Sequence, residues 1–153
     1  MPVINYGFGV NTALAGFLAC VLAAITVVDL RTLRIPNRIV LPATAVVLLV
    51  RAILLPTSLP GYLLAAGLTA TLLLIPSLFN AAWMGMGDVK LGLLLGATLG
   101  SAALGALFIA FFACFPFAVA LLVRGRNNSL PFGPFMAFGA LAVLALPLVG
   151  VAG

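Results

Sequence analysis

Long apolar runs separated by short polar loops constrain this chain more than any other feature. The runs cover about residues 10–28, 39–55, 61–79, 91–123 and 135–151. About 20 consecutive apolar residues are enough for a helix to cross the hydrocarbon core of a bilayer. In lipid, a helix is favoured because it satisfies its backbone hydrogen bonds internally. The sequence therefore predicts an all-α polytopic membrane protein, organised as one integral-membrane domain over residues 1–153.

The run over residues 91–123 is too long for one crossing. As a single helix, its 33 residues (91 through 123) would extend about 50 Å, against a hydrocarbon core of roughly 30 Å. Two helices that meet near Gly100 and Ser101 fit better, which makes about six spans, with a short fourth span opened by Asp88.

The positive charges favour this count of six spans. With six spans, six of the seven Lys and Arg residues fall in loops on one face: Arg31, Arg34, Arg38, Lys90, Arg124 and Arg126. By the positive-inside rule that face is cytoplasmic and the N-terminus lies outside. The seventh, Arg51, lies near the far end of the second span, where we expect its side chain to snorkel outward.

Composition removes several classes of function. The chain has no histidine, which excludes a histidine-based active site or metal centre. The net charge of +5 is dispersed over short loops, so it indicates contact with anionic lipid and no nucleic-acid partner. The two cysteines lie inside apolar runs, where a free cysteine behaves as a small hydrophobe.

Asp29 and Asp88 are the only acidic residues in the chain. The six-span topology places both on one side of the membrane at similar depth, where a carboxyl group is costly and usually functional or paired. Local ion pairs are disfavoured, because the nearby basic residues lie two or five positions away and helical pairing needs three or four.

Other interpretations of the two acids stay open. Either carboxylate can pair with an arginine of another loop. A proton-coupled transporter also uses membrane acids, although normally nearer the midplane. The chain could also be a non-catalytic membrane assembly subunit. A metal site is disfavoured, because two carboxylates without histidine or cysteine leave a divalent ion poorly satisfied.

A stripe of small residues follows the second acid. Asp88, Gly92, Gly96 and Gly100 recur every four residues, a spacing that lets membrane helices approach closely. Packing on this face carries Asp88 toward a neighbouring helix. If that neighbour is the first span, the two carboxyl groups can meet as a dyad.

Three motifs, taken in order, resemble the type IV prepilin peptidases, a family of GxGD intramembrane aspartyl proteases. Gly85-Met-Gly-Asp88-Val-Lys90 matches the GxGD signature. The segment from Asp29 to Asn37, with its Pro36-Asn37, looks like the first-aspartate segment of the family. Leu130-Pro-Phe-Gly-Pro-Phe135 is similar to the PFGPF element before the last helix.

The resemblance implies an aspartic endopeptidase that cleaves the leader of type IV prepilin-like proteins at the cytoplasmic face of the bacterial inner membrane. It makes Asp29 and Asp88 the catalytic pair, one as general base and the other as general acid, with no cofactor. The chain is similar to the short members that serve Flp or tight-adherence pili, and it lacks a cysteine-rich segment, so methylation of the pilin is not implied.

The same motifs supply residues that would shape the site or bind substrate. We expect Gly85 and Gly87 to give flexible backbone beside Asp88, where an extended leader could add as a strand. We expect the prolines of the third motif to fix the entry of the last span, and Pro36 to end the first helix near Ile35. The full set of these residues is Gly85, Gly87, Lys90, Pro36, Asn37, Pro131, Gly133 and Pro134.

Overall fold

The computed structural model describes residues 3–79, 85–124 and 131–151, and this part of the chain forms six helices and no strand. The prediction of an all-α polytopic membrane protein is confirmed. In chain order the helices are α1 (Val3–Thr32), α2 (Asn37–Leu54), α3 (Leu59–Phe79), α4 (Met86–Leu99), α5 (Ala102–Val123) and α6 (Gly133–Val151).

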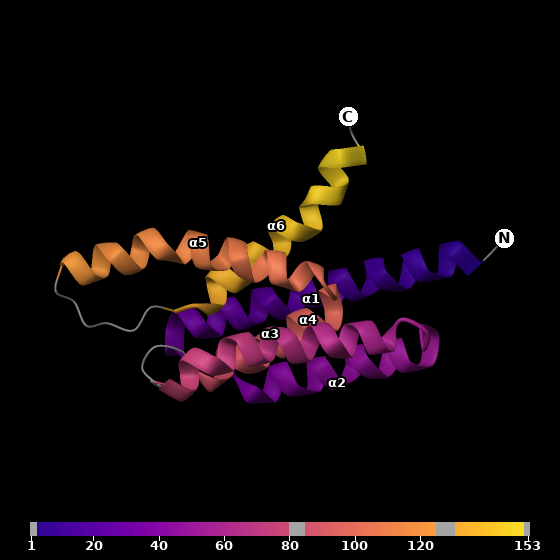
Figure 1. Cartoon of the computed structure of the whole chain (residues 1–153), viewed down its shortest axis with the longest axis horizontal. Helices are drawn as coiled ribbons and strands as arrows, with labels where there is room; N and C mark the ends of the chain where they lie inside the picture. The colour runs from indigo at the N-terminus through magenta and orange to yellow at the C-terminus, as the bar shows by residue number, and fades with distance from the viewer. Residues whose placement is uncertain (1–2, 80–84, 125–130, 152–153) are drawn as a thin grey trace.

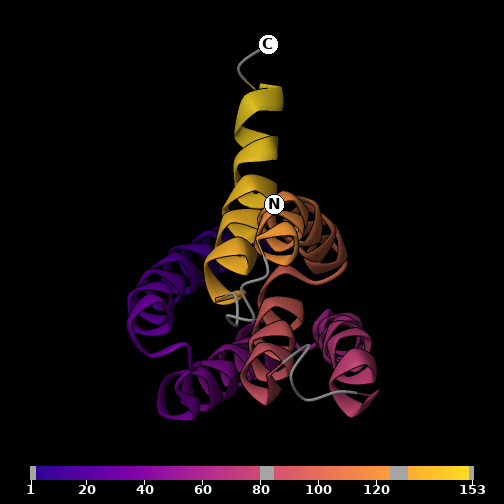
Figure 2. The ribbon, with the colours of Figure 1, turned by 90° about the vertical axis from the view of Figure 1, so that its left-hand side faces the viewer.

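Successive helices run in opposite directions along the bundle (Figure 1). The end of α1 and the starts of α4 and α6 therefore gather at one end, and the turn between α2 and α3 lies at the other. The last helix leans away from the bundle toward its C-terminal end (Figures 1 and 2). Within the described residues, four helices are long and apolar enough to cross a membrane, over Gly9–Thr32, Asn37–Leu54, Leu59–Phe79 and Ala102–Leu121.

Helix α4 is the short central element. It has 14 residues, of which eight are buried, and the end-on view shows the other helices around it (Figure 2). The core is formed by large aliphatic side chains of α1 and α4, which include Leu18, Leu22, Leu94 and Leu95. The expected break near Gly100 and Ser101 is present, since α4 ends at Leu99 and α5 begins at Ala102.

The first helix ends three residues earlier than Pro36 predicts. It stops at Thr32 instead of near Ile35, because Leu33 has a φ of 51° and so leaves the right-handed helical region. The hydroxyl of Thr32 donates to the carbonyl of Val28 at 2.8 Å, and the N–H of Leu33 donates to the carbonyl of Asp29 at 2.8 Å. Asp29 is therefore in the last turn of α1.

The glycine stripe of α4 faces α3, so the neighbour that the sequence left open is the third helix and not the first. A Cβ on Gly96 would clash with the backbone of Ala66, and one on Gly92 would lie 2.6 Å from the Leu73 side chain. The Thr69 hydroxyl donates to the carbonyl of Gly92 at 2.8 Å. Small residues on α3 allow this close approach, whereas the buried face of α1 carries large leucines.

Candidate active site

Asp29 lies at the end of α1 and is held by the start of α6. Its side chain is buried, and its Oδ2 accepts a hydrogen bond of 3.0 Å from the N–H of Gly133, the first residue of α6. The N–H groups of a first helical turn have no partner within their own helix and carry partial positive charge. The carboxylate of Asp29 therefore satisfies one of these donors and is stabilised by the helix end.

The contact between the Asp29 carboxylate and the backbone of residue 133 is so close that it requires glycine at this position. A Cβ built on Gly133 would lie 2.6 Å from Oδ2 of Asp29, closer than real Cβ atoms come to other atoms, and 3.2 Å from its Cγ, which is a tight contact. Any larger residue would push the carboxylate away from the backbone N–H that positions it.

Asp88 lies in the first turn of α4 and is held by its own helix. Its Oδ2 accepts a hydrogen bond of 3.1 Å from the N–H of Gly85, and its own N–H donates to the carbonyl of Gly85 at 3.0 Å. An acidic side chain three residues after the N-cap commonly reaches back to the N-cap N–H in this way. Asp88 is therefore held locally by a backbone hydrogen bond. The spacing of the basic residues had already disfavoured a local ion pair.

The two carboxylates share one end of the bundle. Asp29 comes from the last turn of α1 and Asp88 from the first turn of α4, 59 positions later in the chain. They lie where the end of α1 meets the starts of α4 and α6 (Figure 1).

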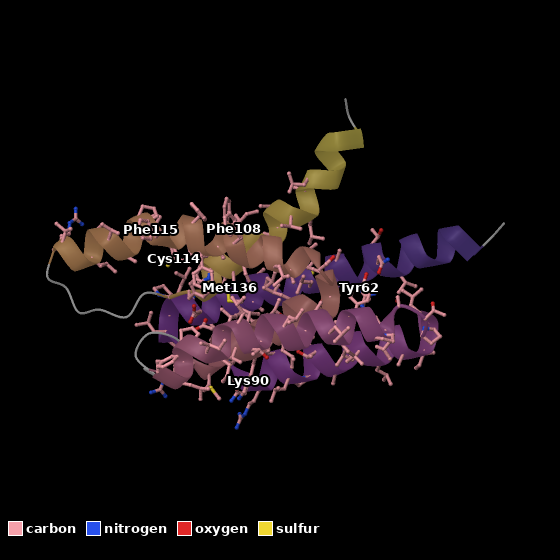
Figure 3. The ribbon with its side chains drawn as sticks, viewed as in Figure 1. Tyr62, Lys90, Phe108, Cys114, Phe115 and Met136 are labelled. Carbon is pink, nitrogen blue, oxygen red and sulfur yellow. The ribbon has the colours of Figure 1, made fainter. Side chains whose placement is uncertain are left out.

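The start of α4 is fastened to the loop between α1 and α2. A Cβ on Gly87 would lie 2.7 Å from the Cβ of Ile35, so the backbone of α4 touches this loop beside Pro36. The Lys90 ammonium donates to Oδ1 of Asn37 at 3.0 Å, and Lys90 points outward from the bundle (Figure 3). The two motifs that contain the aspartates are thus in direct contact, through residues that the sequence marks as site-shaping.

Aromatic side chains of α5 hold the start of α6 beside Asp29. The ring of Phe111 lies 5.2 Å from that of Phe132, and the ring of Phe117 lies 5.4 Å from that of Phe135. Cys114 lies between Phe111 and Phe117 in the sequence of α5. Helix α5 therefore packs against the start of α6, which holds Asp29, a role that the sequence did not indicate.

The remaining predicted residues, Pro36, Pro131 and Pro134, lie at the same end of the bundle, before α2 and at the start of α6. Pro131 and Pro134 are half-buried on both sides of Gly133, and Pro134 is in the first turn of α6, where a missing N–H costs nothing. Arg126 lies outside the described residues. Among the described residues there is no group of three His, Cys, Asp or Glu side chains that could hold a metal ion.

Arg51 is the polar residue that sequence reasoning misplaced. It was expected to snorkel outward, but it is 1 % exposed, because its guanidinium binds the end of α4 instead of solvent. Its Nε donates to the carbonyl of Ala97 at 2.8 Å and its Nη2 to that of Thr98 at 2.6 Å. The sequence did carry a signal for a buried position, because Arg51 lies inside an apolar run and Tyr62 lies near the start of the next run.

The fold and this site define a multi-pass membrane protein with a carboxylate pair at one end of its helix bundle. The chain belongs to the type IV leader peptidase family, whose model matches residues 16–123. No match was found among curated proteins or among solved structures. The matched region includes both aspartates and ends before Gly133, so the contact between Gly133 and Asp29 lies partly beyond it.

Proposed function

We propose that this peptidase is an aspartic endopeptidase that removes the leader from type IV prepilin-like proteins, with Asp29 and Asp88 as its catalytic pair. The observation that carries the proposal is that the end of α1, with Asp29, and the start of α4, with Asp88, lie at the same end of the bundle (Figure 1). Membership of the type IV leader peptidase family supports the class of reaction.

The chemistry follows from two carboxyl groups at close range, because mutual repulsion makes one of them retain its proton. The ionised group accepts a proton from water while the water oxygen bonds to the scissile carbonyl carbon. The protonated group donates its proton to the carbonyl oxygen. When the tetrahedral intermediate collapses, the C–N bond breaks, the amine takes the proton from the first carboxyl, and the second recovers its own.

The backbone contacts of the two acids suit this role. Gly133 and Gly85 each donate one N–H to a single carboxylate oxygen, which orients the carboxylate and leaves its other oxygen for water or substrate. The protons belong to the pair, so the roles of base and acid are not divided between Asp29 and Asp88.

We place the pair at the cytoplasmic face of the bacterial inner membrane. The same end of the bundle carries the exposed arginines Arg31, Arg34, Arg38 and Arg124, and cytoplasmic loops are enriched in such residues. A reporter fused after Arg126 should therefore be cytoplasmic and one fused at Ser58 external, and the reverse pattern would contradict this placement. The partners are the lipid bilayer and a prepilin substrate.

The test is cleavage of a co-expressed prepilin, read as a leader-sized mobility shift. Asp29→Asn and Asp88→Asn should each abolish the shift, because asparagine is nearly isosteric and removes the titrating proton. If the acids act as one unit, each single change costs about as much as both together. Arg34→Gln, an exposed arginine at the same end, is the control and should cleave normally. Substantial cleavage by either Asn variant at normal membrane abundance would refute the proposal.

A further inference from the structure

The C-terminal end of α4 lies inside the bundle, far from the carboxylate pair. A helix of 14 residues is about 21 Å long, which is shorter than a hydrocarbon core of roughly 30 Å. Since α4 begins at the end of the bundle where α1 ends (Figure 1), it stops short of the opposite end, and Ala97 and Thr98 in its last turn are buried. The final carbonyl groups of a helix have no partner within the helix, and in the membrane interior they cannot use bulk water.

Arg51 supplies the missing donors. The guanidinium reaches from α2 to the carbonyls of Ala97 and Thr98, at 2.8 and 2.6 Å. Its positive charge also lies at the end of α4 that carries partial negative charge. The neighbouring carbonyl of Gly96 accepts from the N–H of Gly100 at 3.0 Å, so Arg51 and the Gly100 turn together satisfy the end of the helix.

The same guanidinium is held by the two other helices at this end. Its Nη1 donates to Oδ1 of Asn11 on α1 at 3.1 Å, and its Cζ lies 3.3 Å from the centre of the Tyr62 ring on α3. Tyr62 lies toward the end of the bundle that carries the turn between α2 and α3 (Figure 3). Arg51 thus connects α1 and α4, the two helices that carry Asp29 and Asp88.

We propose that Arg51 is a positioning residue for the catalytic pair, which fixes how far α4 extends along α1 and so sets the height of Asp88 relative to Asp29. The inference rests on the proposed function. Its physical reason is that a short helix can shift along its axis unless both ends are held. Lys90 and Gly87 hold the start of α4, and Arg51 holds its end.

The experiment measures kcat, KM and the pH profile of prepilin cleavage for Arg51→Met, which keeps a long apolar side chain and removes every donor. A carboxyl misplaced by about 1 Å can lower the rate by roughly 100-fold. We therefore expect a fall of that order in kcat with KM little changed, and about a tenfold fall for Arg51→Lys. The matched control is Arg38→Met, the same change at an exposed arginine of α2, which should behave as the unmodified chain.

The pH profile separates positioning from simple loss of folded protein. Two coupled carboxyl groups give a bell-shaped profile whose limbs belong to the pair, so a greater separation should bring the limbs together. A smaller folded fraction would only scale the curve. If Arg51→Met does not accumulate, Arg51→Lys and Asn11→Ala carry the test, the latter because it removes only the tie to α1.

An unchanged kcat and an unchanged pH profile in every Arg51 or Asn11 variant that folds would overturn the inference. The proposed function fails in a different way, since the unmodified chain would then not cleave the prepilin at all. Cleavage by the unmodified chain with normal variants therefore rejects only the role of Arg51.

Discussion

Gly133→Ala is the perturbation that tests the site most directly. The new Cβ would lie 2.6 Å from Oδ2 of Asp29, whereas ordinary contacts begin at 3.4 Å, so the carboxylate must move by about 0.8 Å. Backbone conformation adds no strain, because the only glycine with positive φ among the described residues is Gly100. The cost therefore comes from displacing Asp29.

The expected magnitude follows from this displacement. An error of about 1 Å in a catalytic group can lower the rate by roughly 100-fold, which corresponds to about 2.7 kcal/mol in the activation free energy. We expect kcat for prepilin cleavage to fall by this order in Gly133→Ala. The stability of the bundle should change little, since the residue is at a helix start.

The assay compares cleavage rates at equal amounts of folded protein in membranes. Gly16→Ala is the matched control, because it lies on the same helix as Asp29 and a Cβ there meets nothing within 4 Å. It should cleave at the normal rate and be slightly more stable, as alanine is the better helix former. If Gly133→Ala cleaves as fast as Gly16→Ala, then Asp29 does not need the position in which this structure holds it.

Two further predictions concern stability and metal. Thr26→Val should leave the thermal unfolding midpoint unchanged or raise it, because the Thr26 hydroxyl is the one buried side-chain oxygen without a hydrogen-bond partner among the described residues. Thr44→Val should lower the midpoint, because it removes a 2.8 Å hydrogen bond to the carbonyl of Val40. An equal loss of stability in both variants would contradict this prediction. Chelators should leave cleavage unchanged, since two carboxylates without histidine are a poor ligand set for a divalent ion, and loss of cleavage that one added metal restores would show otherwise.

The sequence predicted the features that depend on length and order along the chain. Apolar runs indicated the membrane helices, and the excessive length of residues 91–123 indicated the break at Gly100. Alternation of direction then placed Asp29 and Asp88 on one side. These predictions needed only helix geometry and the thickness of a bilayer, which is why they could be made without tertiary information.

Features that depend on which helices touch could not be predicted in this way. The glycine stripe of α4 faces α3, because the small residues Ala66 and Thr69 leave room for it, and the sequence alone offered several possible neighbours. Arg51 was misplaced because hydropathy registers its charge but not the carbonyl groups of another helix that receive it. The PFGPF motif marked Gly133 for attention without revealing that Asp29 lies against it.

The charged side chains inside this bundle are arranged by helix ends and not by pairing with one another. The two carboxylates bind N–H groups at the starts of α6 and α4, and the buried guanidinium of Arg51 binds carbonyls at the end of α4. Each charge is therefore opposite in sign to the partial charge of the helix end that it meets. A backbone N–H positions a carboxylate and favours its charged form less strongly than a full counter-ion does, which is compatible with the acid–base role proposed for the two aspartates. A salt bridge to an arginine would position an aspartate equally well but would oppose its protonation.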